Sequence, residues 1–145
     1  MYKYILIATD GSELAQRAVT RGLTLAKALG AKVIAITVTD MFPTGSYSSI
    51  PMPSMIERYE EAAAESAANI LSSVSDEATK LGVACATVHV KEQTPAEGIL
   101  ATAREKGCDL IVMDSHGRRG IARLLLGSQA QKVVTLSPMT VLIYR

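Results

Sequence analysis

The chain has 145 residues and a formal net charge of +1, with 48% hydrophobic and 20% charged residues. This size and composition are typical of one soluble globular domain, which we expect to span residues 1–145. The near-neutral charge gives no strong field for nucleic acid or a membrane surface. No apolar stretch approaches the roughly 20 residues that span a bilayer, and the first apolar run is too short for a signal peptide. We therefore expect a cytoplasmic protein that binds neither nucleic acid nor membranes.

Five apolar runs alternate with stretches of helical periodicity along the chain. Continuous rather than alternating apolar residues are typical of strands that are covered on both faces. Apolar residues that recur every three or four positions are typical of amphipathic helices. We therefore predict strands at 4–8, 32–38, 83–90, 110–113 and 140–144, with helices at 13–29, 54–81, 95–106 and 128–135 between them.

Capping signals mark the expected helix ends. A serine or threonine before a helix accepts a backbone N–H, and a glutamate three residues later completes a capping box. A glycine just after a helix adopts the left-handed conformation that commonly ends it. By these signals the first helix runs from Ser12 to Gly30, the second from a capping box at 54–57 to Gly82, and the third from a capping box at 94–97 to Gly107.

Residues 41–53, MFPTGSYSSIPMP, interrupt this pattern with prolines, serines and a glycine. The segment is longer than a usual connection between a strand and a helix. Two interpretations stay open, namely a lid or binding segment and a loop without a ligand role.

Strict alternation of strands and helices predicts a doubly wound α/β fold, Rossmann-like, with one five-stranded parallel sheet. Ligands of such sheets bind past the carboxyl ends of the strands, where the strand order reverses. In a sheet of order 3-2-1-4-5 that point lies between the first and fourth strands. We therefore expect residues 8–10 and 113–117 to face each other across one crevice.

The segment 109–128, DLIVMDSHGRRGIARLLLGS, combines a buried strand, a glycine-bearing loop and the start of a helix. Backbone N–H groups at a helix start favour anions, and glycines let a backbone approach a ligand closely. From the loop alone, phosphate binding and a turn that simply needs glycine both remain open. The residues behind the phosphate interpretation are Gly117, Gly120 and Gly127, with Arg118, Arg119 and Arg123 adding positive charge.

The histidines and cysteines give no sign of catalysis or of a metal site. His116 has no identified acid or nucleophile beside it, so we interpret it as a hydrogen-bonding loop residue, and His89 within a strand as structural. Cys85 and Cys108 lack metal-site spacing, and we predict buried free thiols. No lysine of the Walker type follows the glycines.

Three stretches together resemble the universal stress proteins: ATDGS after the first strand, TVTD after the second, and SHGRRGIARLLLGS after the fourth. The resemblance covers the whole chain in the order and length of its elements. The ATP-binding branch of that family carries G-x-x-G, nine residues, then G-[ST]. Gly117, Gly127 and Ser128 fit the second half of this pattern, whereas Asp114 replaces its first glycine.

The resemblance implies a nucleotide site. Adenine and ribose would lie at the ends of the first two strands, and the phosphates would meet N–H groups of the glycine loop and the following helix. Asp10 and Ser128 also fit capping roles, which are compatible with binding. The implied ligand is ATP or AMP, with Mg²⁺ accompanying a triphosphate, although no residue set marks a metal site. The implied site residues are Ala8, Thr9, Asp10, Val38, Met113, Asp114, Gly117, Gly127, Ser128, Gln129 and Ala130.

The carboxylate of Asp114 has two opposite interpretations. It would repel a triphosphate that approaches it, to an extent set by local screening. In the second interpretation, the carboxylate accepts hydrogen bonds from ribose hydroxyls, as acidic residues do in other nucleotide-binding folds. The sequence leaves both open.

The last strand would form a sheet edge rich in apolar residues, which invites pairing with another chain. The resemblance implies a homodimer in which these strands pair antiparallel across a two-fold axis. The residues concerned are Val141, Leu142, Ile143 and Tyr144.

The sequence thus favours a homodimeric stress-response or regulatory module that binds an adenine nucleotide. A dimeric interaction protein of the same family that binds no nucleotide is the alternative, and Asp114 is its best support. A slow ATPase is a third hypothesis. Phosphoryl transfer needs a placed nucleophile and charge stabilisation, and we identify no catalytic residue.

Overall fold

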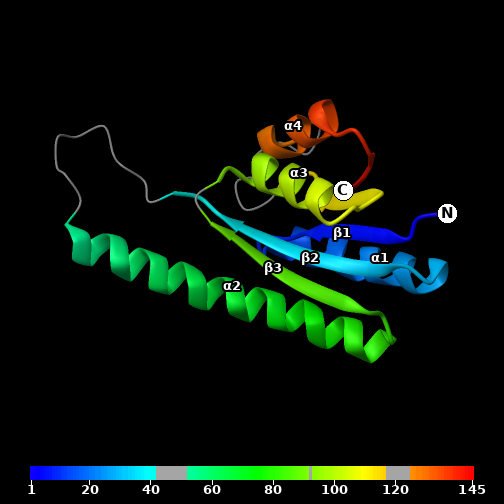
Figure 1. Cartoon of the computed structure of the whole chain (residues 1–145), viewed down its shortest axis with the longest axis horizontal. Helices are drawn as coiled ribbons and strands as arrows, with labels where there is room; N and C mark the ends of the chain where they lie inside the picture. The colour runs from blue at the N-terminus through cyan, green and yellow to red at the C-terminus, as the bar shows by residue number, and fades with distance from the viewer. Residues whose placement is uncertain (42–51, 92, 117–124) are drawn as a thin grey trace.

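The computed structural model describes residues 1–41, 52–91, 93–116 and 125–145. Strands and helices alternate along the chain, as expected (Figure 1). In chain order they are β1 (Tyr4–Ala8), α1 (Glu13–Leu29), β2 (Lys32–Thr39), α2 (Pro53–Leu81), β3 (Cys85–Lys91), α3 (Pro95–Glu105), β4 (Leu110–Asp114), α4 (Ser128–Leu136) and β5 (Thr140–Tyr144).

The five strands form one sheet in the order β3-β2-β1-β4-β5, which confirms the predicted topology. Every neighbouring pair is parallel, and Ile5 of β1 is in register with Val33 of β2 and Leu110 of β4. The strand order reverses between β1 and β4. Their carboxyl ends therefore lie side by side, where ligands bind in open sheets of this class.

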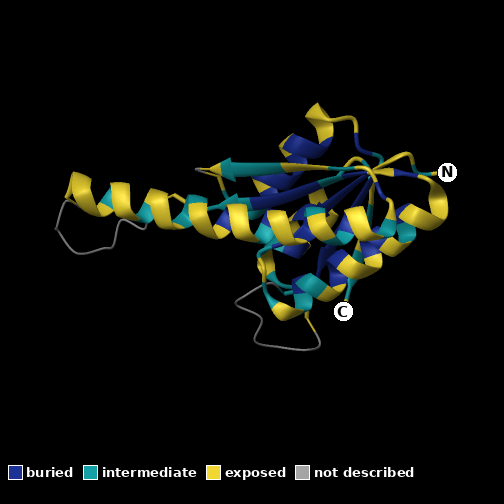
Figure 2. Ribbon diagram, turned by 90° about the horizontal axis from the view of Figure 1, so that it is seen from below, coloured by how far each residue is buried: buried dark blue, intermediate teal, exposed yellow. Residues whose placement is uncertain are grey.

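Two apolar cores cover the two faces of the sheet. The central strands β1 and β4 between them are the most buried strands (Figure 2), whereas the outer strands β3 and β5 are only partly buried. Helices α1 and α2 pack on one face, and α3 and α4 pack on the other (Figure 1). Ile5 and Ile7 of β1 belong to the first core, whereas Leu6 belongs to the second. Because successive side chains enter opposite cores, β1 reads as a continuous apolar run.

Two of the predicted helix starts are confirmed by side-chain caps. Ser12 Oγ accepts the N–H of Ala15 at 3.2 Å, and Thr94 Oγ1 accepts the N–H of Glu97 at 3.4 Å. The predicted stops are confirmed where Gly30 and Gly82 adopt left-handed φ angles of 65° and 73°.

The predicted capping box at 54–57 is wrong, because α2 begins at Pro53 after Met52 and has no side-chain cap. Proline fits the first helical position, since its missing N–H would have no intrahelical acceptor there. The helix therefore starts ahead of the serine that was expected to cap it.

The third strand begins at Cys85, whereas its apolar run predicted a start at residue 83. The N–H of Val83 donates to the carbonyl of Ala78 at 2.9 Å and thereby closes the end of α2. Val83 is buried, but its N–H serves the helix and not the sheet.

Helix α2 is much longer than the sheet that it covers. Its 29 residues span about 43 Å at the α-helical rise of about 1.5 Å per residue. Its buried residues all lie in the second half of the helix, at Ala67, Leu71, Val74 and Ala78. The first half therefore extends beyond the carboxyl edge of the sheet (Figures 1 and 2). Among the helices described, none has the length and apolar character needed to cross a bilayer.

Candidate nucleotide-sized pocket at the carboxyl edge of the sheet

A pocket of about 640 Å³ lies at the carboxyl edge of the sheet, within the size range of small-molecule sites. Its floor is formed by the ends of β1, β2 and β4. Helix α2 supplies one wall, and the starts of α3 and α4 supply the other. The crevice expected between the first and fourth strands is therefore present.

Every predicted site residue that the structure describes lines this pocket. Gly117 lies outside the described residues, as do Gly120 and the arginines of the same loop. The predicted residues that line the pocket are Ala8, Thr9, Asp10, Val38, Met113, Asp114, Gly127, Ser128, Gln129 and Ala130.

The end of β1 is held in a tight turn. Thr9 Oγ1 accepts the N–H of Gly11 at 3.1 Å, and Asp10 Oδ1 accepts the N–H of Ser12 at 2.9 Å. Gly11 has a φ of 79°, a conformation that suits glycine. Asp10 therefore caps the turn into α1 and also lines the pocket, a position that is compatible with both roles considered for it.

The end of β4 brings a buried carboxylate to the pocket. Asp114 is the last residue of β4 and is 6% exposed, as is Met113 before it. The N–H of Ser115 donates to the carbonyl of Tyr144 at 3.0 Å, which continues the pairing of β4 with β5 beyond Asp114. The position at which the family pattern expects glycine is thus inside the pocket and not at its rim.

The start of α4 is fixed against the end of β4 by Gly127. Its N–H donates to the carbonyl of Ser115 at 2.6 Å. A Cβ on Gly127 would lie 3.0 Å from Ser115 O and 3.2 Å from His116 Cα. The φ of Gly127 is −60°, so glycine is needed here for close approach and not for an unusual backbone conformation.

Gly127, not Ser128, is the N-cap of α4, and as a glycine it has no side chain to cap the helix. The capping role considered for Ser128 is therefore wrong, because Ser128 is the first helical residue. The first N–H groups of a helix have no intrahelical acceptor. Those of Ser128, Gln129 and Ala130 are at the pocket, where the helix dipole favours an anion.

The side chain of Gln129 has a structural role that the sequence did not suggest. Its Oε1 accepts the N–H of Ala96 at 3.0 Å, so Gln129 caps the start of α3. Its Oε1 is therefore occupied, and the ligand role expected of Gln129 concerns its backbone N–H at the start of α4.

The wall supplied by α2 was missed from the sequence. Tyr59 donates its hydroxyl to the carbonyl of Asp40 at 3.0 Å, and both residues line the pocket. The remaining lining residues of α2 are Ala62, Ala63, Ser66, Ala67 and Ile70.

Both histidines make hydrogen bonds of the expected kind. His116 Nδ1 lies 2.8 Å from Ser115 Oγ, which confirms a hydrogen-bonding loop residue. His89 Nε2 lies 2.7 Å from Thr39 Oγ1 between β3 and β2. Burial, with a smaller effect of Lys91, lowers the pKa of His89, which suits a structural residue. No group of three metal-ligating side chains is found among the residues described.

Both cysteines are free thiols, as predicted, but only Cys108 is fully buried, whereas Cys85 is partly exposed. Burial raises the pKa of both thiols, that of Cys108 to about 11 with a further contribution from Asp109. A thiol with a raised pKa is a poor nucleophile at neutral pH. Neither cysteine lines the pocket.

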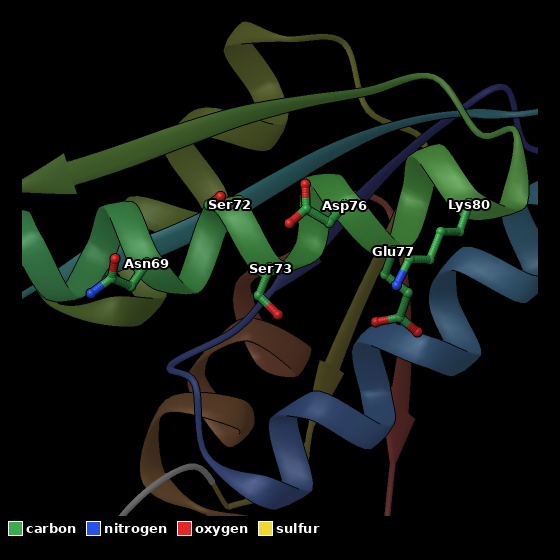
Figure 3. A pocket seen from close by; sticks show the side chains of 6 residues that line it. All are labelled: Asn69, Ser72, Ser73, Asp76, Glu77 and Lys80. Atoms are coloured by element: carbon green, nitrogen blue, oxygen red, sulfur yellow. The ribbon is translucent and has the colours of Figure 1, made fainter.

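A second hollow lies along the second half of α2, lined by Asn69, Ser72, Ser73, Asp76, Glu77 and Lys80 (Figure 3). Glu77 points toward α1 (Figure 3) and accepts hydrogen bonds from Gln16 Nε2 at 2.9 Å and Thr20 Oγ1 at 2.6 Å. We interpret this hollow as part of the contact between α1 and α2, because its best-placed carboxylate is already engaged there.

The fold and the pocket define an α/β protein with a ligand-sized cavity at the switch point of a parallel sheet. Residues 1–145 match the model of the universal stress protein family, and the chain belongs to that family.

Individual relatives agree with this assignment. Universal stress protein MJ0531 from Methanocaldococcus jannaschii is 34% identical over 100% of this chain and 83% of its own length. The solved structure of hypothetical protein MJ0577 is 30% identical, with a TM-score of 0.80 over 99% of this chain and 96% of that one. A universal stress protein solved in complex with cAMP is 28% identical, with a TM-score of 0.70 over 99% of this chain and 97% of that one.

Proposed function

We propose that this protein binds an adenine nucleotide, ATP with Mg²⁺ or AMP, and acts as a homodimeric regulatory module of the stress response in the cytoplasm. The observation that carries the proposal is one pocket that joins the carboxyl ends of β1, β2 and β4 to the start of α4. The family relative solved with cAMP supports an adenine nucleotide as the class of ligand.

Within this proposal the two ends of the nucleotide meet different surfaces. Adenine and ribose lie against Ala8, Thr9, Asp10, Val38 and Met113, which line the pocket at the ends of β1, β2 and β4. The phosphates lie at the start of α4, where uncapped backbone N–H groups attract negative charge.

Isothermal titration of nucleotide-stripped protein with ATP and AMP, with and without Mg²⁺, tests the proposal. We expect saturable binding in the micromolar range, and a loss of roughly tenfold or more in Gly127→Ala, because the added Cβ pushes the start of α4 from the end of β4. Ser73→Ala, an exposed serine of the second hollow, is the control and should bind as the wild type does. Absence of binding to either nucleotide would contradict the proposal.

The buried carboxylate of Asp114 favours a second candidate, a dimeric interaction protein whose pocket excludes nucleotides. On that proposal, Asp114→Gly creates or markedly strengthens ATP binding, because it removes a negative charge that the phosphates would face. If Asp114 instead accepts hydrogen bonds from ribose hydroxyls, the same change weakens binding. Titrating ATP into both proteins separates these two roles.

The homodimer is proposed from the edge position of β5. Strand β5 pairs with β4 on one side, and it is an outer strand of the sheet order. Leu142 is 45% exposed, whereas Val141 and Ile143 pack against the core under α3 and α4. Pairing of two such edges, through Val141, Leu142, Ile143 and Tyr144, would cover the exposed backbone and Leu142.

A further inference from the structure

One ring nitrogen of His116 is buried without a hydrogen-bond partner. Nδ1 lies 2.8 Å from Ser115 Oγ, but Nε2 has no donor or acceptor in reach. Among the residues described, Nε2 of His116 is the one buried side-chain nitrogen or oxygen that lacks a hydrogen-bond partner. Buried polar atoms are nearly always paired, because leaving one unpaired costs stability. Because His116 lines the pocket, a bound ligand is a candidate partner for its Nε2.

His116 lies directly beside the start of α4. Its Cα and carbonyl O are 3.2 Å and 3.3 Å from the position that a Cβ would take on Gly127, the N-cap of the helix. Both residues line the pocket, together with the uncapped N–H groups that begin with Ser128. The unpaired Nε2 and a helix start whose first N–H groups have no intrahelical acceptor thus meet at one end of the pocket.

The chemistry of the ring indicates which kind of group would satisfy it. A neutral imidazole has one donor and one acceptor nitrogen. If the Ser115 hydroxyl donates to Nδ1, the hydrogen is on Nε2 and Nε2–H is a donor. This donor and the α4 N–H groups require an acceptor-rich group, and the helix dipole favours a negatively charged one. A phosphate meets both requirements.

We propose that Nε2 of His116 is a phosphate-recognising donor that makes this pocket prefer a nucleoside monophosphate to the corresponding nucleoside. The inference rests on the proposed adenine-nucleotide function and assigns a specificity residue within it. Without ligand the Nε2 donor is unpaired, and the phosphate nearest the sugar supplies its acceptor.

The test compares AMP and adenosine by isothermal titration with wild type, His116→Asn and His116→Gln. An asparagine amide reaches the position of Nδ1 and keeps a partner for Ser115, but it has no group at the position of Nε2. A glutamine amide reaches the position of Nε2. We expect His116→Asn to lower AMP affinity by roughly tenfold or more and to leave adenosine affinity unchanged, since a hydrogen bond to a charged group is lost. His116→Gln should recover most of the preference for AMP.

Each other outcome has a distinct meaning. Equal AMP affinity in wild type and His116→Asn would overturn the inference and leave the proposed function standing. A parallel loss of AMP and adenosine binding in His116→Asn would show a structural role and overturn it as well. If wild type binds neither ligand, the proposed function fails and the inference falls with it.

Discussion

A single side chain, that of Gln129, couples the start of α4 to the start of α3. Its Oε1 accepts the Ala96 N–H, which would otherwise be one of the unpaired donors of α3. The two helices that border the pocket opposite α2 are therefore joined at their N-termini by this contact.

Replacing Gln129 should reveal the strength of that coupling. We expect Gln129→Ala to lower the free energy of unfolding by about 1 kcal/mol, because a buried donor loses its acceptor. Gln131→Ala is the matched control, since Gln131 is an exposed glutamine of the same helix and should change stability by less than about 0.5 kcal/mol. Urea unfolding of both variants measures the difference. Equal effects would show that the cap contributes nothing.

Cys108 gives the stability of the protein a dependence on alkaline pH. Burial and then Asp109 raise its pKa from 9.0 to about 11. A group whose pKa is higher in the folded state stabilises that state below the unfolded pKa, and this contribution is lost as pH rises through the folded pKa. We expect the free energy of unfolding to fall between pH 9 and 11, and to fall less in Cys108→Ala. Urea titrations across this range measure it, and identical pH profiles of the two proteins would contradict the assignment.

At the scale of elements, α3 packs on β2 through a glycine. A Cβ on Gly98 would lie 2.9 Å from Val38 Cγ2 and 3.2 Å from Val90 Cγ1. Valine is stiff about χ1, so it cannot easily turn away. The close approach of this helix therefore sets the position of Val38, a residue of the proposed nucleotide site.

A pair of substitutions tests whether the close contact between Gly98 and Val38 limits what fits at this position. Gly98→Ala should destabilise the protein by about 1–2 kcal/mol, because overpacking outweighs the better helix propensity of alanine. In a Val38→Ala background the same change should cost clearly less, because the contacts with Val38 are removed and only the 3.2 Å contact with Val90 Cγ1 remains. Urea unfolding of the four proteins in the cycle provides the values. Strictly additive effects would show that Gly98 and Val38 do not press on each other.

The sequence predicted the strands well because burial on both faces leaves an unbroken apolar run, as in Ile5, Leu6 and Ile7. The sheet order followed from general rules of α/β folds and from the family resemblance. The α2 wall could not be predicted from the sequence, because helical periodicity places Tyr59 and Ala67 on one apolar stripe but does not show where the sheet beneath the helix ends. The cap formed by Gln129 on Ala96 was also beyond reach, since it joins residues 33 positions apart.

At the scale of the whole molecule, the proposed dimer puts β5 at its centre. Leu142→Lys should convert the dimer to a monomer, because each edge would carry a charge into the interface. Met55→Lys is the control, since Met55 is a comparably exposed apolar residue of α2, a helix that packs on β2 and β3 at the opposite side of the sheet from β5. Light scattering after size exclusion gives the mass of each protein. A wild-type monomer, or a Leu142→Lys dimer, would contradict the arrangement.

The first half of α2 extends beyond the sheet, and this affects how fast the backbone around the pocket exchanges its amide hydrogens. The first half of this helix contributes a wall but holds no fully buried residue, so little packing energy opposes its local unfolding. Its amide hydrogens should exchange with solvent faster than those around Leu71 and Val74. A ligand that contacts Tyr59 or Ala63 would then slow exchange over whole turns that it does not touch, because a helix forms cooperatively. Slower amide exchange in the exposed turns of α2 would thus indicate that the pocket is occupied, at a surface well away from the bound molecule.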